Sequence, residues 1–486
     1  MPILTFIENK NRIKIEFEGT PILRDLLIRH RLYIDSPCGA SGKCGKCKVS
    51  LRGEVSPPNA AEQKNNCRLA CQARLFGDCE AELLQNEAEF AEILTESDIS
   101  VQRSNEWLYG VAIDIGTTTV VLKLYNNLGI CVAEAADINP QREIAFDIIG
   151  RLSEAENGKA ALLQQQITQK ISELLLYACR VGRVMPEQIG KTVITGNTAM
   201  LYLYCGISPK SIARAPFAAD NLFGVYINGN VYLAPCISAF IGGDLVCALL
   251  ASKITEHGGC SMLIDIGTNG ELALWKGNKL FVTSCAAGPA FEGGEISVGC
   301  GSILGAVERV TIDCGKPKAE TIGCIAPVGI CGSGLIDAAS VFLDLGYIDK
   351  SGYASKELVL SANGGSIKLL QDDIRALQLA KSAIRTGIEA LLTHTETQYS
   401  EIETLYIAGG FGNRLSVESA INIGLLPKEL AGNVKYIGNA ALGGAVSMLF
   451  NSEEIEKAEH IAKNASPLNL ATSPEFYESF IKYIDF

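Results

Sequence analysis

Two stretches of the chain repeat one pattern: VAIDIGTTTVVLKLY at residues 111–125 and MLIDIGTNGELALW at residues 262–275. Both contain the run Ile-Asp-Ile-Gly-Thr, at 113–117 and again at 264–268, within alternating apolar residues. Apolar residues lead into each Asp-x-Gly-Thr turn and resume after it, which predicts a strand, a tight turn and a second strand. Because the copies lie a whole domain apart, we expect two opposed halves that clasp one ligand.

The two turns have the composition of phosphate sites. Gly116 and Gly267 remove side-chain bulk, so backbone N–H groups and threonine hydroxyls can reach phosphate oxygens. Asp114 and Asp265 are then placed to hold Mg²⁺, which prefers carboxylate oxygens and keeps several of its waters. The candidate phosphate-binding residues are Gly116, Thr117, Thr118, Gly267, Thr268 and Asn269.

Later segments add candidates to the same site. LYIAGGFGNRLSV (405–417) predicts a strand that runs into Gly409, Gly410 and Gly412, whose bare backbone suits adenine and ribose. Gly332 and Ser333 in GICGSGLID form a candidate nucleotide-facing turn. Three further candidates have two readings each: Asp244 positions the attacking water or caps a helix, while Asn197 and Asn439 orient phosphate or cap helices.

The order of two phosphate turns and a Gly-rich adenosine turn resembles the superfamily of acetate and sugar kinases, heat-shock chaperones and actin. That resemblance implies two ribonuclease-H-like lobes hinged around Mg·ATP. The chain contains no G-x-x-x-x-G-K-[ST] motif, which argues against a P-loop ATPase.

Cysteines are concentrated near the N-terminus. SPCGASGKCGKCKVS (36–50) places Cys38, Cys44 and Cys47 as C-x5-C-x2-C in a Gly-rich loop, and three more cysteines follow at 67, 71 and 79. Three thiolates in such a loop plus one distant thiolate predict a [2Fe–2S] site, with zinc or buried thiols as alternatives. The segment resembles [2Fe–2S] ferredoxins, and the likeness of RLACQA to their last-ligand segment implies Cys71 as the fourth ligand. Spacing leaves Cys67 and Cys79 open.

The 486 residues divide into three expected parts. Residues 1–83 read as a β-grasp, [2Fe–2S] ferredoxin-like domain, with two strands in 3–17 and a helix capped by Thr20 with Pro21 at its first position. Residues 84–107 read as a linker. Residues 108–486 alternate strands with longer helices, as in α/β architecture, and form the two-lobed, actin-like ATPase domain.

Composition excludes several function classes. The net charge of −12 and the lack of a Lys/Arg cluster argue against nucleic-acid binding. No secretory signal and no convincing membrane span are present. The 17 cysteines, eleven of them scattered outside the N-terminal group, favour a reducing cytoplasm.

The whole chain resembles the reductive activators of corrinoid enzymes, which join an N-terminal [2Fe–2S] domain to an ATPase of this superfamily. The likeness runs through INPQREIAFDIIGRL, VITGNTAM, SCAAGPAFEGGEISVG and IAGGFGNRL, among other segments of 30–450. It implies ATP-dependent reduction of cob(II)amide to cob(I)amide on a corrinoid protein or corrinoid-dependent methyltransferase in anaerobic metabolism. It also implies an external electron donor, a homodimer and a partner contact near Ser284. Larger members carry a further middle domain, for which residues 84–107 leave no room.

Two alternatives remain. One is an activator of another low-potential enzyme, such as a 2-hydroxyacyl-CoA dehydratase. The other is a non-redox ATP-binding module or kinase whose cysteines hold a structural metal.

Overall fold

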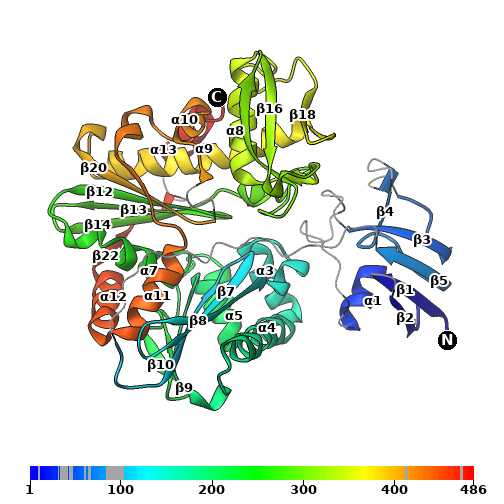
Figure 1. Ribbon diagram of the computed structural model, residues 1–486, viewed down its shortest axis with the longest axis horizontal. Helices are drawn as coiled ribbons and strands as arrows, with labels where there is room; N and C mark the ends of the chain where they lie inside the picture. The colour runs from blue at the N-terminus through cyan, green and yellow to red at the C-terminus, as the bar shows by residue number, and fades with distance from the viewer. Residues whose placement is uncertain are drawn as a thin grey trace.

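The computed structural model describes residues 1–8, 11–30, 32, 42, 47–59, 62–63, 67–83, 103–410, 414–470 and 474–486. A small N-terminal part and a large two-lobed part are evident (Figure 1). The linker predicted for 84–107 lies outside the described residues up to 102. Residues 103–107 pack on the large part, where the Trp107 ring meets that of Phe450 edge-on at 5.0 Å. No described helix combines the length and apolar character that crossing a membrane requires.

The N-terminal part is a five-stranded sheet with strand order β2-β1-β5-β3-β4 and one helix packed on it. The alternating residues expected to give two strands do so, since β1 and β2 pair antiparallel. The predicted helix begins later than expected, at Leu23, because Pro21 accepts a hydrogen bond from Leu75 and Ile22 bridges Arg74. The elements are β1 (Ile3–Glu8), β2 (Asn11–Glu16), α1 (Leu23–Arg29), β3 (Lys48–Val55), β4 (Arg68–Leu69) and β5 (Leu75–Leu83).

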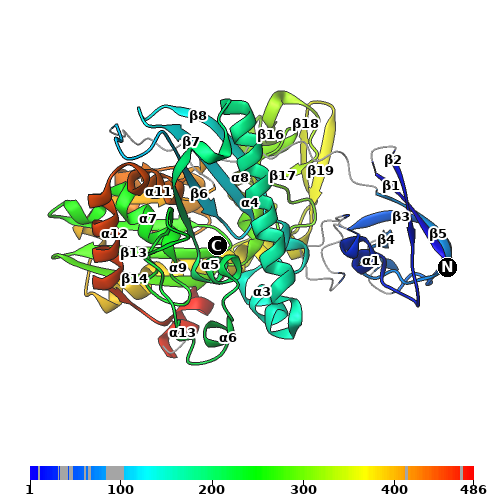
Figure 2. The same ribbon diagram turned by 90° about the horizontal axis from the view of Figure 1, so that it is seen from below.

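The first lobe is a six-stranded sheet with order β10-β11-β9-β6-β7-β8. The first repeated motif forms the hairpin β6–β7, and β9 adds parallel to β6. Helix α4 covers β7 and β8 (Figure 2). The elements are β6 (Tyr109–Ile115), β7 (Thr119–Asn126), β8 (Cys131–Ile138), η1 (Pro140–Glu143), α3 (Ile148–Glu154), α4 (Ala160–Gly182), β9 (Ile189–Gly196), α5 (Thr198–Cys205), α6 (Lys210–Ala213), β10 (Val225–Ile227) and β11 (Val231–Leu233).

The second lobe repeats this plan, with order β21-β20-β12-β13-β14-β22. Its motif forms the antiparallel hairpin β12–β13, and β20 adds parallel to β12 as β9 does to β6. The repeated sequence is therefore a repeated fold, and the prediction of two related lobes is confirmed. The elements are β12 (Cys260–Ile266), β13 (Asn269–Lys276), β14 (Lys279–Ala286), η5 (Pro289–Glu292), α9 (Gln371–His394), β20 (Ile402–Ala408), α10 (Val417–Asn422), β21 (Val434–Tyr436), β22 (Ala465–Pro467) and α13 (Pro474–Lys482).

An insertion between β14 and α9 builds a smaller unit on the second lobe. Strands β15, β16 and β17 form one sheet, and β18 and β19 form a hairpin beside it. The elements are β15 (Ala306–Asp313), β16 (Lys316–Thr321), β17 (Gly329–Ile330), α8 (Gly332–Asp344), β18 (Leu358–Ala362) and β19 (Gly365–Leu369).

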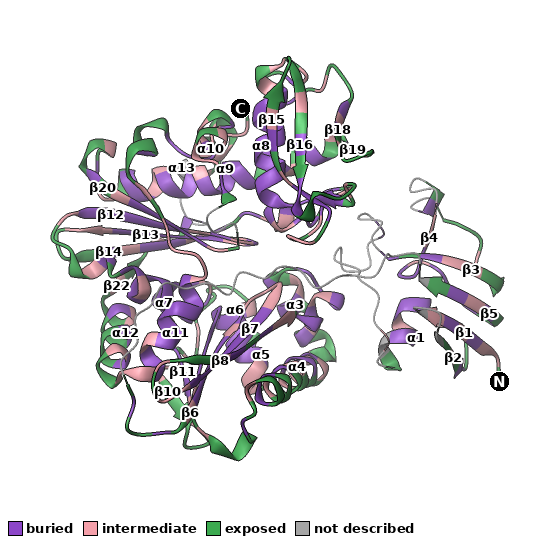
Figure 3. Ribbon diagram, in the orientation of Figure 1, coloured by how far each residue is buried: buried purple, intermediate pink, exposed green. Residues whose placement is uncertain are grey.

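Two apolar helices lie between the lobes. Helices α7 (Gly243–Ser252) and α11 (Ala440–Phe450) pack on each other in one core that takes residues from both sheets. They are buried almost throughout (Figure 3), and α12 (Ser452–Asn464) covers their outer side. The helices therefore form the joint across which the two motif hairpins face each other.

Candidate functional site

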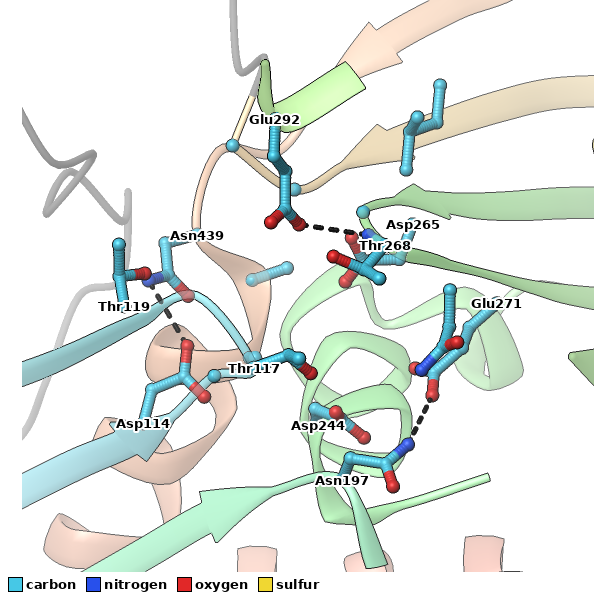
Figure 4. Close-up of a pocket in the computed structure, with 18 residues that line it drawn as sticks. Asp114, Thr117, Thr119, Asn197, Asp244, Asp265, Thr268, Glu271, Glu292 and Asn439 are labelled. Carbon is cyan, nitrogen blue, oxygen red and sulfur yellow. Dashed lines mark hydrogen bonds between the residues drawn. The ribbon is translucent and has the colours of Figure 1, made fainter. Parts of the chain in front are cut away.

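The turns of both motif hairpins open into one cleft between the lobes (Figure 4). The predicted residues Asp114, Gly116 and Thr117 line it from the first lobe. The second lobe contributes Asp265, Gly267, Thr268, Asn269, Gly409 and Gly410. Asp244, Asn197, Glu271, Glu292, Asn439 and Thr119 complete the polar lining.

A cluster of carboxylates forms the floor of this cleft. Burial and the charge of Asp265 raise the pKa of Asp114 to about 7. Burial, with Asp244 and Glu292 nearby, raises the pKa of Asp265 to about 7. Asp244 has a pKa near 7 for the same reasons, burial and then Asp114. The pKa of Glu271 is also raised, because it is buried beside Asp244.

This donor set fits a divalent cation. Among the described residues that line the cleft there is no lysine or arginine to neutralise the acids. In the described part of the chain, no three acidic, His or Cys side chains converge closely enough to surround a metal by themselves. A hydrated Mg²⁺, which shares its coordination with phosphate and water, matches such an open acidic floor.

Two asparagines connect the floor to helix termini, so the capping reading is confirmed for both, and a role in orienting phosphate stays a prediction. Asn197 caps α5 through Ala199 N–H and donates from Nδ2 to Oε1 of Glu271 at 3.2 Å. Asn439 caps α11 through Leu442 N–H, and its Nδ2 lies 3.4 Å from Oδ2 of Asp114. Asp244 lies in the first turn of α7, where its Oδ1 accepts from Leu245 N–H at 2.9 Å.

Two of the three glycines predicted to face adenosine, those after the end of β20, line the cleft. Gly409 has φ +101°, and a Cβ there would crowd Oδ1 of Asp265 and the carbonyl oxygen of Ile266. Glycine is required at this position for the strand to end against the acid floor. Gly410 faces open space, and Gly412 lies outside the described residues.

Other predicted residues lie elsewhere. Gly332 and Ser333 begin α8, where Ser333 Oγ donates to the carbonyl of Glu308, and the pair does not line the cleft. Ser284 lies half-buried on β14 opposite Glu271. The polar cleft residues that the sequence did not reveal are Thr119, Glu271 and Glu292. The sequence could have identified Glu271, because an acidic residue within the apolar strand NGELALW is unusual.

Glu292 joins the two phosphate turns. Its Oε1 accepts the Thr268 N–H at 2.9 Å, and its other oxygen accepts the Thr118 hydroxyl. These donors belong to opposite lobes and are those predicted to bind phosphate. The position of Glu292, 174 residues from Thr118, gave no indication of this contact.

The N-terminal part brings two of the predicted cluster cysteines together. Ala70 N–H donates to the carbonyl of Cys47, so Cys71 lies next to Cys47, and both are buried. Gln72 Nε2 lies 3.6 Å from Sγ of Cys71, a donor of the kind that tunes a metal-bound thiolate. Cys38 and Cys44 lie outside the described residues. The two described cysteines, Cys47 and Cys71, are buried and close together, as ligands of an iron–sulfur cluster would be.

Cys67 and Cys79, the alternatives for the fourth ligand, lie at different distances from Cys47. Cys67 is near Cys47, whose charge contributes, after burial, to raising the pKa of Cys67. Cys79 pairs with Gly53, six positions along β3 from Cys47, or about 20 Å at the strand rise. Burial raises the pKa of Cys79 to about 11.

Three family models match the chain. Residues 6–75 match a 2Fe–2S iron–sulfur cluster binding domain, residues 109–257 the RACo middle region, and residues 259–486 the C-terminal ASKHA domain of RACo. The middle region is thus present as the first lobe, so the expectation that it has no room is wrong.

Two curated proteins and one solved structure are similar over long stretches. A corrinoid activation enzyme, RamQ of Eubacterium limosum, is 33% identical over 77% of this chain and 70% of its own length. A reductase of the methylated amine-specific corrinoid protein in Methanosarcina barkeri is 28% identical over 54% of this chain and 53% of its own. The structure of a reductive activator for a corrinoid, iron–sulfur protein aligns with 100% of this chain and 98% of that one, at a TM-score of 0.73 and 26% identity.

Proposed function

Because this chain belongs to the family of RACo and the corrinoid activation enzymes, we propose that it hydrolyses ATP to deliver one electron to a corrinoid protein. The electron converts cob(II)amide on that partner to cob(I)amide. The observation that carries the proposal is the pair of opposed phosphate turns above an acid floor, joined in one chain to a ferredoxin domain.

Each part of the cleft receives a role. Asp114 and Asp265 hold a hydrated Mg²⁺, and the turns at Gly116 and Gly267 bind phosphate oxygens from opposite sides. Asp244 orients the attacking water, since it shares the floor with both acids. Gly409, Gly410 and Gly412 accept adenosine where no Cβ obstructs it.

The ferredoxin domain holds its cluster through Cys38, Cys44, Cys47 and Cys71. A bound [2Fe–2S] cluster supplies a one-electron carrier. Burial of Cys47 and Cys71 shields the thiolates from water, and Gln72 donates to Cys71. The fourth-ligand assignment is supported by the closeness of Cys71 to Cys47 and by the distance of Cys79 from it, while Cys67, also near Cys47, is the alternative.

ATP has a thermodynamic purpose in this pairing. A one-electron step against a potential gap of about 60 mV costs about 1.4 kcal/mol. Closure of the lobes on nucleotide can offset that cost if it changes the surroundings of the acceptor. We place this reaction in the cytoplasm, with an external protein as electron donor. Contact of the partner with Ser284, which lies half-buried on β14 opposite Glu271, stays a prediction.

The test is an anaerobic reduction assay with protein whose cluster has been verified. The protein, a chemical reductant and a cob(II)amide-loaded corrinoid protein are mixed, and cob(I)amide absorbance is followed with and without Mg·ATP. We expect reduction only with ATP. Asp265→Asn should lower the rate by about 100-fold or more, the scale seen when one charge-stabilising group is lost.

The matched control is Asp313→Asn, the same chemical change on the exposed end of β15, where the Asp313 side chain is 56% exposed. This variant should keep the wild-type rate. Cob(I)amide formation at the same rate with and without Mg·ATP would refute the proposal. Steady ATP hydrolysis without cobalt reduction on any of several corrinoid proteins would favour a different low-potential acceptor.

A further inference from the structure

Residues 139–151, which run from the end of β8 into α3, hold the backbone of the first phosphate turn. Asn139 Nδ2 donates to the carbonyl of Gly116 at 2.8 Å, and Asn139 N–H donates to that of Thr118 at 2.8 Å. Arg151 Nη2 donates to the carbonyl of Thr117 at 2.5 Å. Every carbonyl of the turn 116–118 is thus bound by this one segment, so the turn and the segment must move together.

Arg151 also ties the segment to itself. The side chain has no exposed surface, and Nε donates to the carbonyl of Ala145 at 3.0 Å while Nη2 reaches that of Phe146 at 3.3 Å. A buried guanidinium bonded to carbonyls on both sides is costly to displace, because each lost bond leaves an unpaired buried group. The phosphate turn and the loop 145–146 are therefore held in one fixed relation.

The ferredoxin domain contacts the same segment. Arg24 of α1 donates from Nη2 to the carbonyl of Glu143, and both residues are nearly buried, at 6% and 9% exposed. The backbone N–H of Arg24 donates to the carbonyl of Ala70 at 2.9 Å. Ala70 directly precedes Cys71, so Arg24 lies between the cluster strand and the segment.

The second lobe touches the segment as well. A Cβ built on Gly294 would lie 2.9 Å from Cζ of Phe146, so the ring of Phe146 packs against the backbone two residues after Glu292. Glu292 bridges Thr118 and Thr268 across the cleft. A phosphate that takes these donors must move Glu292, and Phe146 is next to the loop that would carry the movement.

We propose that residues 139–151 couple nucleotide binding in the cleft to the ferredoxin domain, with Arg151 and Arg24 as the positioning residues at its two ends. The coupling rests on the proposed function, since it needs both a bound nucleotide and a cluster. Coupling between two sites is reciprocal, so nucleotide shifts the reduction midpoint of the cluster, and reduction changes nucleotide affinity by the same factor.

The experiment measures this reciprocity without any corrinoid partner. The full chain is prepared anaerobically with its cluster, and the Kd of Mg·ADP is measured on oxidised and reduced protein by calorimetry. The cluster midpoint is titrated by electron paramagnetic resonance with and without saturating Mg·ADP. For the wild type we expect about a tenfold difference in Kd between redox states, matched by a midpoint shift of about 59 mV.

Three variants and one control locate the coupling. Arg24→Gln should bind both cluster and nucleotide but lose the difference in Kd, while Arg24→Lys, which can still donate one bond, should keep part of it. The control Arg29→Gln makes the same change at an exposed site on the same helix and should behave as wild type. Arg151→Lys tests the other end, with thermal melting used to verify its fold.

Each result decides the matter. Equal Kd values in both redox states of wild-type protein that binds cluster and nucleotide would overturn the coupling and leave the proposed function intact. If Arg29→Gln and Arg24→Gln lose the difference in Kd equally, Arg24 has no specific role in the coupling. Failure of the wild type to bind Mg·ADP or a cluster would overturn the coupling and the proposed function together.

Discussion

The carboxylate of Glu292 takes the same donors that we propose for a nucleotide phosphate. It accepts from Thr118 in one lobe and Thr268 in the other. Because it carries a negative charge beside the phosphate position, we expect Glu292→Gln to tighten Mg·ADP binding. Two like charges several ångströms apart in a partly buried site repel by about 1 kcal/mol or more, so the Kd should fall about fivefold to tenfold.

Calorimetry on the oxidised protein measures this change. Glu320→Gln, on the exposed strand β16, is the control and should leave the Kd unaltered. A tenfold weaker Kd in Glu292→Gln would instead make Glu292 a ligand of the bound cation.

The cysteines allow an equally direct prediction. Cys71→Ser should abolish the [2Fe–2S] cluster, because the buried thiol next to Cys47 is lost. Cys79→Ser should retain it, since Cys79 lies on β5 opposite Gly53, far along the sheet. Visible absorbance and iron and acid-labile sulfide analysis of anaerobically purified protein measure the outcome. Zinc without sulfide in the wild type would favour the structural-metal alternative.

The contrast between residues predicted and residues missed has a physical cause. Asp114 and Asp265 stand in a repeated local motif, so their pairing could be inferred without knowing the fold. Glu292 and Arg151 act through contacts with residues far along the chain, and no local pattern marks such a contact. Gly332 and Ser333 have the composition of a phosphate turn, yet they form the first turn of α8 in the insertion after β14, away from the cleft.

The crossing of α7 and α11 depends on one glycine. A Cβ on Gly444 would overlap the backbone carbonyl of Cys247, so neither helix can relieve the clash by a side-chain movement. We expect Gly444→Ala to force the helices apart and to destabilise the protein by about 1–3 kcal/mol, the usual cost of overpacking a core. Gly258→Ala, where no atom lies within 4 Å of the new methyl group, is the control.

The melting temperature measures the stability of the packing of α7 on α11, and the Mg·ADP Kd measures its effect on the cleft. A Gly444→Ala protein with wild-type melting would show that the helices separate at no cost. The helices themselves could be expected from their apolar sequences. Their contact could not, since it joins segments from both halves of the repeat.

The last residues of the chain, after helix α13, are held to α9 by a buried lysine. Lys381 donates to the carbonyl of Asp485, and burial lowers the pKa of its ammonium to about 8. Between pH 8 and about 10.5 the folded protein holds this lysine neutral while the unfolded chain keeps it protonated. The unfolded state then binds more protons, so this group makes the folded state more stable as pH rises through that window.

We therefore expect wild type to gain stability relative to Lys381→Met between pH 8 and 10.5, measured as the difference in free energy of unfolding from urea titrations. Lys428→Met, at an exposed site, should show no such trend. A difference that is constant or falls with pH would contradict the lowered pKa.

The whole molecule joins two parts with separate cores. One apolar cluster lies wholly within residues 4–81, while the ATPase lobes have their own. Covalent linkage therefore serves to keep the ferredoxin at high local concentration beside the cleft, of the order of millimolar for a short connection. Cutting the chain between residues 83 and 103 at an inserted specific protease site should leave ATP hydrolysis intact and make cob(I)amide formation depend on dilution.

The uncut form of the same variant is the control, and its reduction rate per molecule should not change with dilution below the Kd of the separated parts. If the cut protein instead keeps the uncut rate down to nanomolar concentrations, the contact around Arg24 and Glu143 must itself hold the parts together. The segment 139–151 would then be a permanent interface, and the coupling between nucleotide and cluster would have to operate without separation of the domains.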